Sequence, residues 1–180
     1  MNTTSRILGE ATRPPTKMEL TDPFQAYNYA MDVIKGPFPE GEAAIATNPR
    51  FSYYYAKDVI EGPFPQGESA IATDPDCANA YARNIIKGPF PEGETAIATH
   101  PYFAYVYAKY VKGPFPEGEA AIATHPHFAY VYARDVLKGR FPEAEEAMAK
   151  DPEYSKKYLE AFPDAKIDWY AREWIDWTQL

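Results

Sequence analysis

The sequence predicts an all-α fold, an α-solenoid of tandem two-helix repeats, because two markers recur along it at one period. The block Gly-Pro-Phe-Pro-Glu-Gly-Glu begins at Gly36, Gly88 and Gly113, and close variants of it begin at Gly62 and Gly139. The second marker is a polar residue followed by Pro, and its copies are Asp22-Pro23, Asn48-Pro49, Asp74-Pro75, His100-Pro101, His125-Pro126 and Asp151-Pro152. Successive copies lie 26 residues apart, except for one step of 25 residues.

Each repeat carries the start and stop signals of two helices. The first helix follows an N-cap residue such as Asp22 or Asn48 and has Pro at its first position, where a missing N–H costs nothing. It runs to a glycine such as Gly36, for which we expect the left-handed conformation at the end of the helix. The second helix is shorter, for example Pro39 to Thr47 or Pro116 to Thr124, and it also begins with Pro.

Helical periodicity predicts which side of each helix is buried. In the fifth repeat this face of the first helix comprises Ala129, Tyr132, Ala133, Val136 and Leu137. In the second helix of the first repeat Gly41, Ala44 and Ile45 form a small-residue face, preceded by Phe38. One such hairpin cannot close a core alone, so we expect the repeats to stack.

We divide the chain, as one domain, into a cap segment at residues 1–21, five repeats at residues 22–150 and a degenerate capping repeat at residues 151–180. Thr16 to Thr21 fits a worn second helix, and a final helix is expected near Ile167 to Thr178. That final helix contains Trp169, Trp174 and Trp177, which either seal the last repeat or form a binding patch.

Composition limits the classes of function. The formal net charge of -8 argues against a sequence-independent grip on DNA or RNA, which needs clustered Lys and Arg. Cys77 is the one cysteine, so no internal disulfide is possible and a reducing compartment is expected. The start has no apolar run typical of a signal peptide, and no stretch approaches a membrane span. We therefore expect a soluble protein of the cytoplasm.

The repeat resembles two kinds of helical array. Its paired helices are similar in architecture to tetratricopeptide and Sel1-like α-solenoids, although the unit is shorter and lacks their signature residues. The amino-acid sequence of the repeat also resembles short helical repeats of uncharacterised bacteriophage and large-virus proteins. The resemblance is carried by Tyr55 to Ile60 and Gly62 to Glu68, and by their copies through Glu145. This second resemblance implies a viral origin, a role against a host factor and, for the location, the host cytoplasm.

The leading functional prediction is a non-catalytic scaffold, inhibitor or adaptor that binds another protein. Positions that stay constant between repeats serve packing, whereas positions that change are free to contact a partner. The changing positions of the first helix, from Phe24 and Met31 onward, fall opposite the predicted packing face and form what we call the variable stripe. Its candidate binding residues are Arg50, Tyr54, Lys57, Arg83, Tyr102, Val106, Lys109, His127, Val131 and Arg134. Tyr and Arg are favoured anchors of protein interfaces, although an exposed face can also simply drift.

The alternative is an acidic nucleic-acid mimic that blocks a DNA- or RNA-binding enzyme. Carboxylates recur at the start of every second helix, and this acidic row consists of Glu40, Glu42, Glu68, Glu92, Glu94, Glu117, Glu119, Glu143 and Glu145. Regularly spaced carboxylates on a stacked array could imitate phosphates. They also interact favourably with helix N-termini, which explains them without any partner.

The sequence offers no catalytic, cofactor or metal site. It contains no phosphate-binding glycine loop, no nucleophile motif and no His-Glu metal helix. His100 and His125 replace the N-cap Asp of two repeats and His127 follows closely, but no further ligand is evident, so we interpret them as residues tolerated at a cap. We expect no enzyme activity, no cofactor and no direct contact with nucleic acid or membrane.

Overall fold

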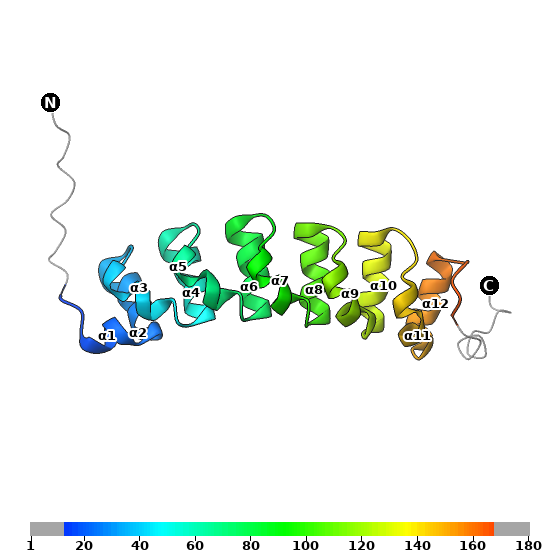
Figure 1. The fold of residues 1–180 in the computed structure, drawn as a ribbon, viewed down its shortest axis with the longest axis horizontal. Coiled ribbons are helices and arrows are strands. Elements are labelled where there is room, and N and C mark those ends of the chain that lie inside the picture. The colour runs from blue at the N-terminus through cyan, green and yellow to red at the C-terminus, as the bar shows by residue number, and fades with distance from the viewer. Residues whose placement is uncertain (1–12, 168–180) are drawn as a thin grey trace, which may run out of the picture. The chain divides into compact units, whose positions relative to one another are not determined.

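The computed structural model describes residues 13–167, and it confirms an all-α fold of tandem two-helix repeats (Figure 1). Within these residues there is no strand. The chain forms two compact units, unit 1 at Met1–Ile71 and unit 2 at Ala72–Leu180. The junction falls between the second and third repeats, just before the third N-cap residue, Asp74.

Most repeats consist of a first helix that passes into a π-helical turn, and then a short second helix. In unit 1 the helices are α1 (Lys17–Thr21), α2 (Pro23–Asn28) with η1 (Tyr29–Ile34), α3 (Pro39–Ile45), α4 (Pro49–Tyr55) with η2 (Ala56–Ile60), and α5 (Pro65–Ile71). In unit 2 the third and fourth repeats are α6 (Pro75–Tyr81) with η3 (Ala82–Ile86), α7 (Pro91–Ile97), α8 (Pro101–Tyr107) with η4 (Ala108–Lys112), and α9 (Pro116–Ala123). The rest of unit 2 is α10 (Pro126–Tyr132) with η5 (Ala133–Leu137), α11 (Pro142–Ala149) and α12 (Pro152–Ala161).

The helices of unit 2 form two rows. The first helices α6, α8, α10 and α12 lie side by side in chain order, and the second helices α7, α9 and α11 form the other row (Figure 1). The core between the rows contains Ala129, Tyr132 and Ala133, which are fully buried as predicted, whereas Val136 and Leu137 of the same predicted face are half-buried. The small-residue face of α3 is buried in the same way in unit 1.

The helix starts follow the sequence prediction, and the ends of the first helices do not. Asp22 and Asn48 cap their helices through side-chain oxygens, with Pro next in each case. The left-handed residue, however, is not the predicted glycine but the residue before it, namely Lys35, Glu61, Lys87 and Lys138. In every repeat it is the residue directly after the π-helical turn that takes a positive φ, and the glycine usually comes one residue later. In the 25-residue repeat no residue separates η4 from the glycine, so Gly113 itself takes a positive φ of 86°.

Close approach of the two helices within a hairpin explains the glycine of the second helix. A Cβ on Gly93 would lie 2.7 Å from the Cβ of Ala78 on α6, and a Cβ on Gly118 would lie 2.8 Å from that of Ala104 on α8. These distances are too short for two carbon atoms, so glycine is required there. Because the two helices of such a hairpin are in close contact, the angle between them can vary little.

Within each unit, a buried tyrosine joins one repeat to the repeat before it. In unit 2 the Tyr107 hydroxyl accepts a hydrogen bond from the Phe90 N–H at 2.9 Å and donates one to Glu94 at 2.8 Å. We call this arrangement the tyrosine latch. It recurs at Tyr132 with Phe115 (2.9 Å) and Glu119 (2.7 Å), at Tyr158 with Phe141 (2.6 Å) and Glu145 (3.4 Å), and in unit 1 at Tyr55 with Phe38 (2.7 Å) and Glu42 (2.9 Å).

The rings of the latch extend the connection along unit 2. The ring of Tyr107 packs edge-on against Phe115 of its own repeat at 5.2 Å, and the Phe115 N–H then donates to Tyr132 of the next repeat. Burial and the adjacent carboxylate raise the pKa of the equivalent Tyr55 to about 12, so its hydroxyl keeps its proton and remains a donor to Glu42. Hydrogen bonds between repeats thus alternate with ring contacts within them.

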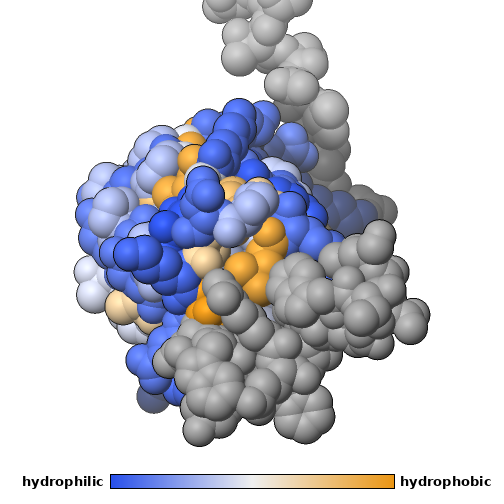
Figure 2. Space-filling view, turned by 90° about the vertical axis from the view of Figure 1, so that its right-hand side faces the viewer, coloured by the Kyte–Doolittle hydropathy of each residue, from blue (hydrophilic) through white to orange (hydrophobic). Residues whose placement is uncertain are grey.

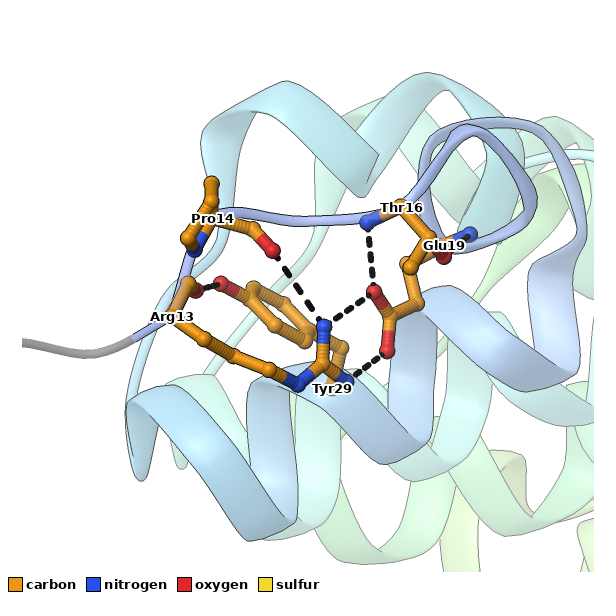
Figure 3. Close-up of polar contacts among 5 residues, drawn as sticks. All are labelled: Arg13, Pro14, Thr16, Glu19 and Tyr29. Carbon is orange, nitrogen blue, oxygen red and sulfur yellow. Dashed lines mark hydrogen bonds and ion pairs between the residues drawn. The ribbon is translucent and has the colours of Figure 1, made fainter.

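In the first repeat, the equivalent tyrosine is Tyr29, and an ion pair lies beside it (Figure 3). Tyr29 donates its hydroxyl to the backbone carbonyl of Arg13, and the Arg13 guanidinium pairs with Glu19 on α1. The Thr16 N–H also donates to Glu19 at 2.6 Å, as in a capping box. Arg13 and this N–H lower the pKa of Glu19 to about 2. A short helix lies where the sequence suggested a worn one, and it packs against α2 and α3.

At the other end, α12 retains the latch although its repeat motif is degraded. Phe162 follows Tyr158 after four residues, yet the two rings still meet at 4.9 Å, because α12 ends without a π-helical turn. The Phe-Pro that arrives early in the sequence therefore completes the ring pair. The predicted helix near Ile167 to Thr178, with its three tryptophans, lies outside the described residues apart from its first residue.

Removal of one latch hydroxyl tests its contribution to stability. We expect Tyr107→Phe to lower the free energy of unfolding by about 1–3 kcal/mol, because it leaves the buried Phe90 N–H without an acceptor. The matched control is Tyr102→Phe on the exposed side of α8, which should change stability by less than about 0.5 kcal/mol. Urea denaturation followed by circular dichroism measures both, and equal effects of the two substitutions would contradict a role for the latch.

Candidate partner-binding surface

The structure places most of the variable stripe at the surface. The exposed members are Arg50, Tyr54 and Lys57 in unit 1, and Arg83, Tyr102, Lys109 and Arg134 in unit 2. His127 is half-buried. Val106 and Val131 are only 5% and 8% exposed, so the expectation that they face a partner is wrong. A wheel drawn for one helix omits the contacts between neighbouring first helices, such as α8 with α10, so it cannot predict the burial of these positions.

Aromatic rings connect the first helices on this face. Tyr102 and Tyr105 of α8 both contact Phe128 of α10, with ring centroids 5.7 and 6.2 Å apart. Tyr130 of α10 contacts Tyr154 of α12 at 6.3 Å. The sequence contains the signal for this row, since an aromatic residue recurs at the third and fifth positions of most first helices. These packed rings form an apolar layer on this face, which we call the aromatic floor.

Cations lie on this floor and are partly neutralised by acidic residues. In unit 2 Arg134 and Lys109 both bind Asp135, at 2.6 and 2.8 Å, and the Tyr105 hydroxyl donates to the same carboxylate at 3.2 Å. Arg134, followed by Lys109, holds the pKa of Asp135 well below its usual range. In unit 1 Lys57 pairs with Asp58 at 3.0 Å.

Two exposed tyrosines stand out on the same face of unit 2. Tyr102 is 44% exposed and Tyr110 is 60% exposed, although both are large aromatic residues. Tyr110 was not among the predicted binding residues. The sequence signal for it is a substitution within the repeat, since Asp58 and Asp135 occupy the equivalent position in the second and fifth repeats.

The histidines are placed against aromatic rings. The side chains of His100 and His125 accept no capping hydrogen bond, and their rings contact Phe103 and Phe128 at 4.8 and 4.6 Å. The Nδ1 atom of His127 lies 3.0 Å from the Tyr154 hydroxyl. In the part of the chain that the structure describes, no group of three His, Cys, Asp or Glu side chains could hold a metal ion.

The acidic row divides into two sets. Glu42, Glu94, Glu119 and Glu145 accept the hydroxyl hydrogen bonds of the tyrosine latches. Two of them also pair with cations, since Glu94 binds Lys112 at 2.7 Å and Glu145 binds Arg140 at 2.8 Å. The exposed set is Glu40, Glu92, Glu117 and Glu143, and the ninth member of the row, Glu68, is half-buried. Latch formation therefore explains four of the nine carboxylates whose regular spacing suggested a phosphate-like row.

A shallow groove of about 560 Å³ lies between the second helices α9 and α11. Its floor is formed by Ala120, Ala123 and Ala147, and Glu143 and Glu146 are among the residues that line it. On the face shown in Figure 2, which is the right-hand side of the view in Figure 1, most of the described surface is hydrophilic, and apolar residues occupy small areas.

Comparison with known proteins finds no family model, no curated protein and no solved structure that matches this chain. Among residues 13–167 no helix combines the length and the apolar character that crossing a membrane would require.

The division of the acidic row can be tested by truncating one member of each set in the same helix. We expect Glu94→Ala to lower the free energy of unfolding by about 1–3 kcal/mol, because Tyr107 and Lys112 both lose their acceptor. Glu92→Ala removes an exposed carboxylate from the first turn of α7 and should cost about 0.5 kcal/mol. Thermal and urea denaturation of the two variants measures the difference. An equal loss would mean that Glu94 has no special role in the latch.

Proposed function

We propose that the protein is a non-catalytic repeat protein that binds another protein through the exposed residues of the variable stripe. The observation that carries this proposal is the outer surface of α8 with η4 and of α10 with η5. Tyr102, Tyr110 and Lys109 are exposed there, and the Lys109 ammonium lies 5.5 Å from the centroid of the Tyr110 ring. Arg134 is exposed on η5, and the ring of Tyr102 packs against Phe128 of α10. Tyr and Arg dominate the energy of protein interfaces, and rings held in place lose little entropy on binding.

The distribution of constant and changing residues supports the same function. The latch residues Tyr107, Phe90 and Glu94 recur in neighbouring repeats and are internal, whereas the exposed residues of the stripe differ from repeat to repeat. A scaffold that repeats its interior and varies its surface suits selective recognition of an extended partner. Because the repeat wording resembles that of phage and large-virus proteins, the partner we propose is a host protein met in the host cytoplasm.

The alternative of an acidic mimic would depend on the exposed carboxylates Glu92, Glu117 and Glu143, which leave one such group per repeat on unit 2. Binding through them would weaken steeply with added salt. The first-helix face offers aromatic anchors as well as charge, and for that reason we favour it.

Capture from the native host with matched variants tests the proposal. We expect the wild-type chain to retain a protein that the double variant Tyr102→Ala and Arg134→Ala retains at least about ten-fold less, because two interface anchors are lost. The control is Glu92→Gln with Thr95→Ala, both exposed on α7, which should retain the same protein as the wild type.

Quantitative mass spectrometry of the captured proteins gives the result. A partner lost with the α7 control and retained by the first-helix variant would overturn the proposal and favour the acidic mimic. A capture profile that is identical for all three proteins would overturn it as well.

A further inference from the structure

One position near the end of the first helix differs in charge between repeats. In the second and fifth repeats an aspartate there pairs with the cation that precedes it, Asp58 with Lys57 and Asp135 with Arg134. In the third and fourth repeats the same position holds Asn84 and Tyr110. The cations that precede them, Arg83 and Lys109, therefore have no carboxylate of their own repeat beside them.

These two cations gather on one exposed ring in unit 2. The Arg83 guanidinium carbon lies 5.0 Å from the centroid of the Tyr110 ring, and the Lys109 ammonium lies 5.5 Å from the same centroid. Lys109 shares Asp135 with Arg134, so these three side chains carry a net charge of +1. No carboxylate within residues 13–167 forms an ion pair with Arg83.

The ring contact leaves the hydrogen-bonding capacity of Arg83 available. A guanidinium that lies over an aromatic ring uses its flat face, whereas its N–H donors point outward in its plane. Such a group suits a carboxylate, which can accept two of these donors side by side. Tyr110, at 60% exposed on η4, provides apolar area beside the charge, and Tyr102 is exposed on α8, the helix that continues into η4.

We propose that the cluster formed by Arg83, Lys109 and Tyr110 binds carboxylate side chains in an acidic segment of the protein partner. This rests on the proposed protein-binding function and adds the chemistry of the partner. The charge of the cluster is complementary to such a segment. The net charge of the chain is -8, so it repels a negatively charged ligand as a whole. This repulsion is weaker for an acidic peptide than for a nucleic-acid strand, because the peptide carries fewer charges per length.

Two labelled peptides provide the probe, one of alternating Glu and Ser and one of alternating Gln and Ser. By fluorescence anisotropy at low salt we expect the wild-type chain to bind the Glu peptide at least about ten-fold more tightly than the Gln peptide. Arg83→Gln should weaken binding of the Glu peptide about three- to five-fold, the range found for single exposed charge pairs. Tyr110→Asp should weaken it similarly, because it restores the counter-charge of the second and fifth repeats.

A third variant should act in the opposite direction. Asp135→Asn frees Lys109 and Arg134 from their shared carboxylate, so we expect it to strengthen binding of the Glu peptide about three-fold. The control Lys150→Gln removes an exposed cation from α11 and should leave the affinity unchanged. A general loss of fold would not strengthen binding in one variant and weaken it in two.

Several results would overturn the proposal. These are equal affinity for the two peptides, an effect of Lys150→Gln as large as that of Arg83→Gln, and tighter, Arg83-dependent binding of oligothymidylate, which would indicate a surface for single-stranded nucleic acid. The capture experiment separates this proposal from the function on which it rests. A partner lost with Tyr102→Ala and Arg134→Ala but retained by Arg83→Gln would preserve protein binding and refute the acidic segment.

Discussion

The tyrosine latch is the interaction on which the rest of the structure depends. In the Pro-Phe-Pro turn before most second helices, the two prolines have no N–H, so in Pro89 to Pro91 the buried Phe90 has the one backbone donor. A buried donor without an acceptor costs about 1–3 kcal/mol. The hydroxyl of Tyr107 meets that requirement from the next repeat, and Glu94 fixes its orientation. Turn, helix start and neighbouring repeat are thereby joined at one point.

This internal connection separates packing from recognition. Because Tyr107, Phe90 and Glu94 hold the repeats together from inside, the outer residues of α8 contribute little to the stability of the fold and can change between repeats. The same connection explains why an acidic row is compatible with a role in packing, since four of its nine carboxylates are hydrogen-bond acceptors in the latch. What remains on the surface of the first helices is an aromatic floor with cations, which is the surface that we propose binds another protein.

Much of the fold could be predicted from the sequence, and where the prediction was wrong the reason is physical. The N-cap residues and prolines predicted the helix starts at Pro23 and Pro49, and their repetition predicted the all-α repeat architecture. It did not predict the left-handed Lys35 and Glu61, because a lone propensity argument assigns that conformation to the glycine that follows. Val106 is buried although it was expected at the surface, because a wheel drawn for one helix omits the contacts between neighbouring first helices. The latch partners also required knowledge of which repeats touch, which periodicity alone cannot give.

Native-state amide hydrogen exchange tests the central claim most directly, because it reports on the Phe N–H groups themselves. The account predicts that the amides of Phe90 and Phe115 exchange slowly in the wild-type chain, at rates close to those of global unfolding. In Tyr132→Phe, the Phe115 amide should exchange much faster while Phe90, whose own acceptor Tyr107 is intact, stays protected until the array unfolds. Fast exchange of both amides in the wild-type chain, or unchanged protection of Phe115 in the variant, would contradict the account.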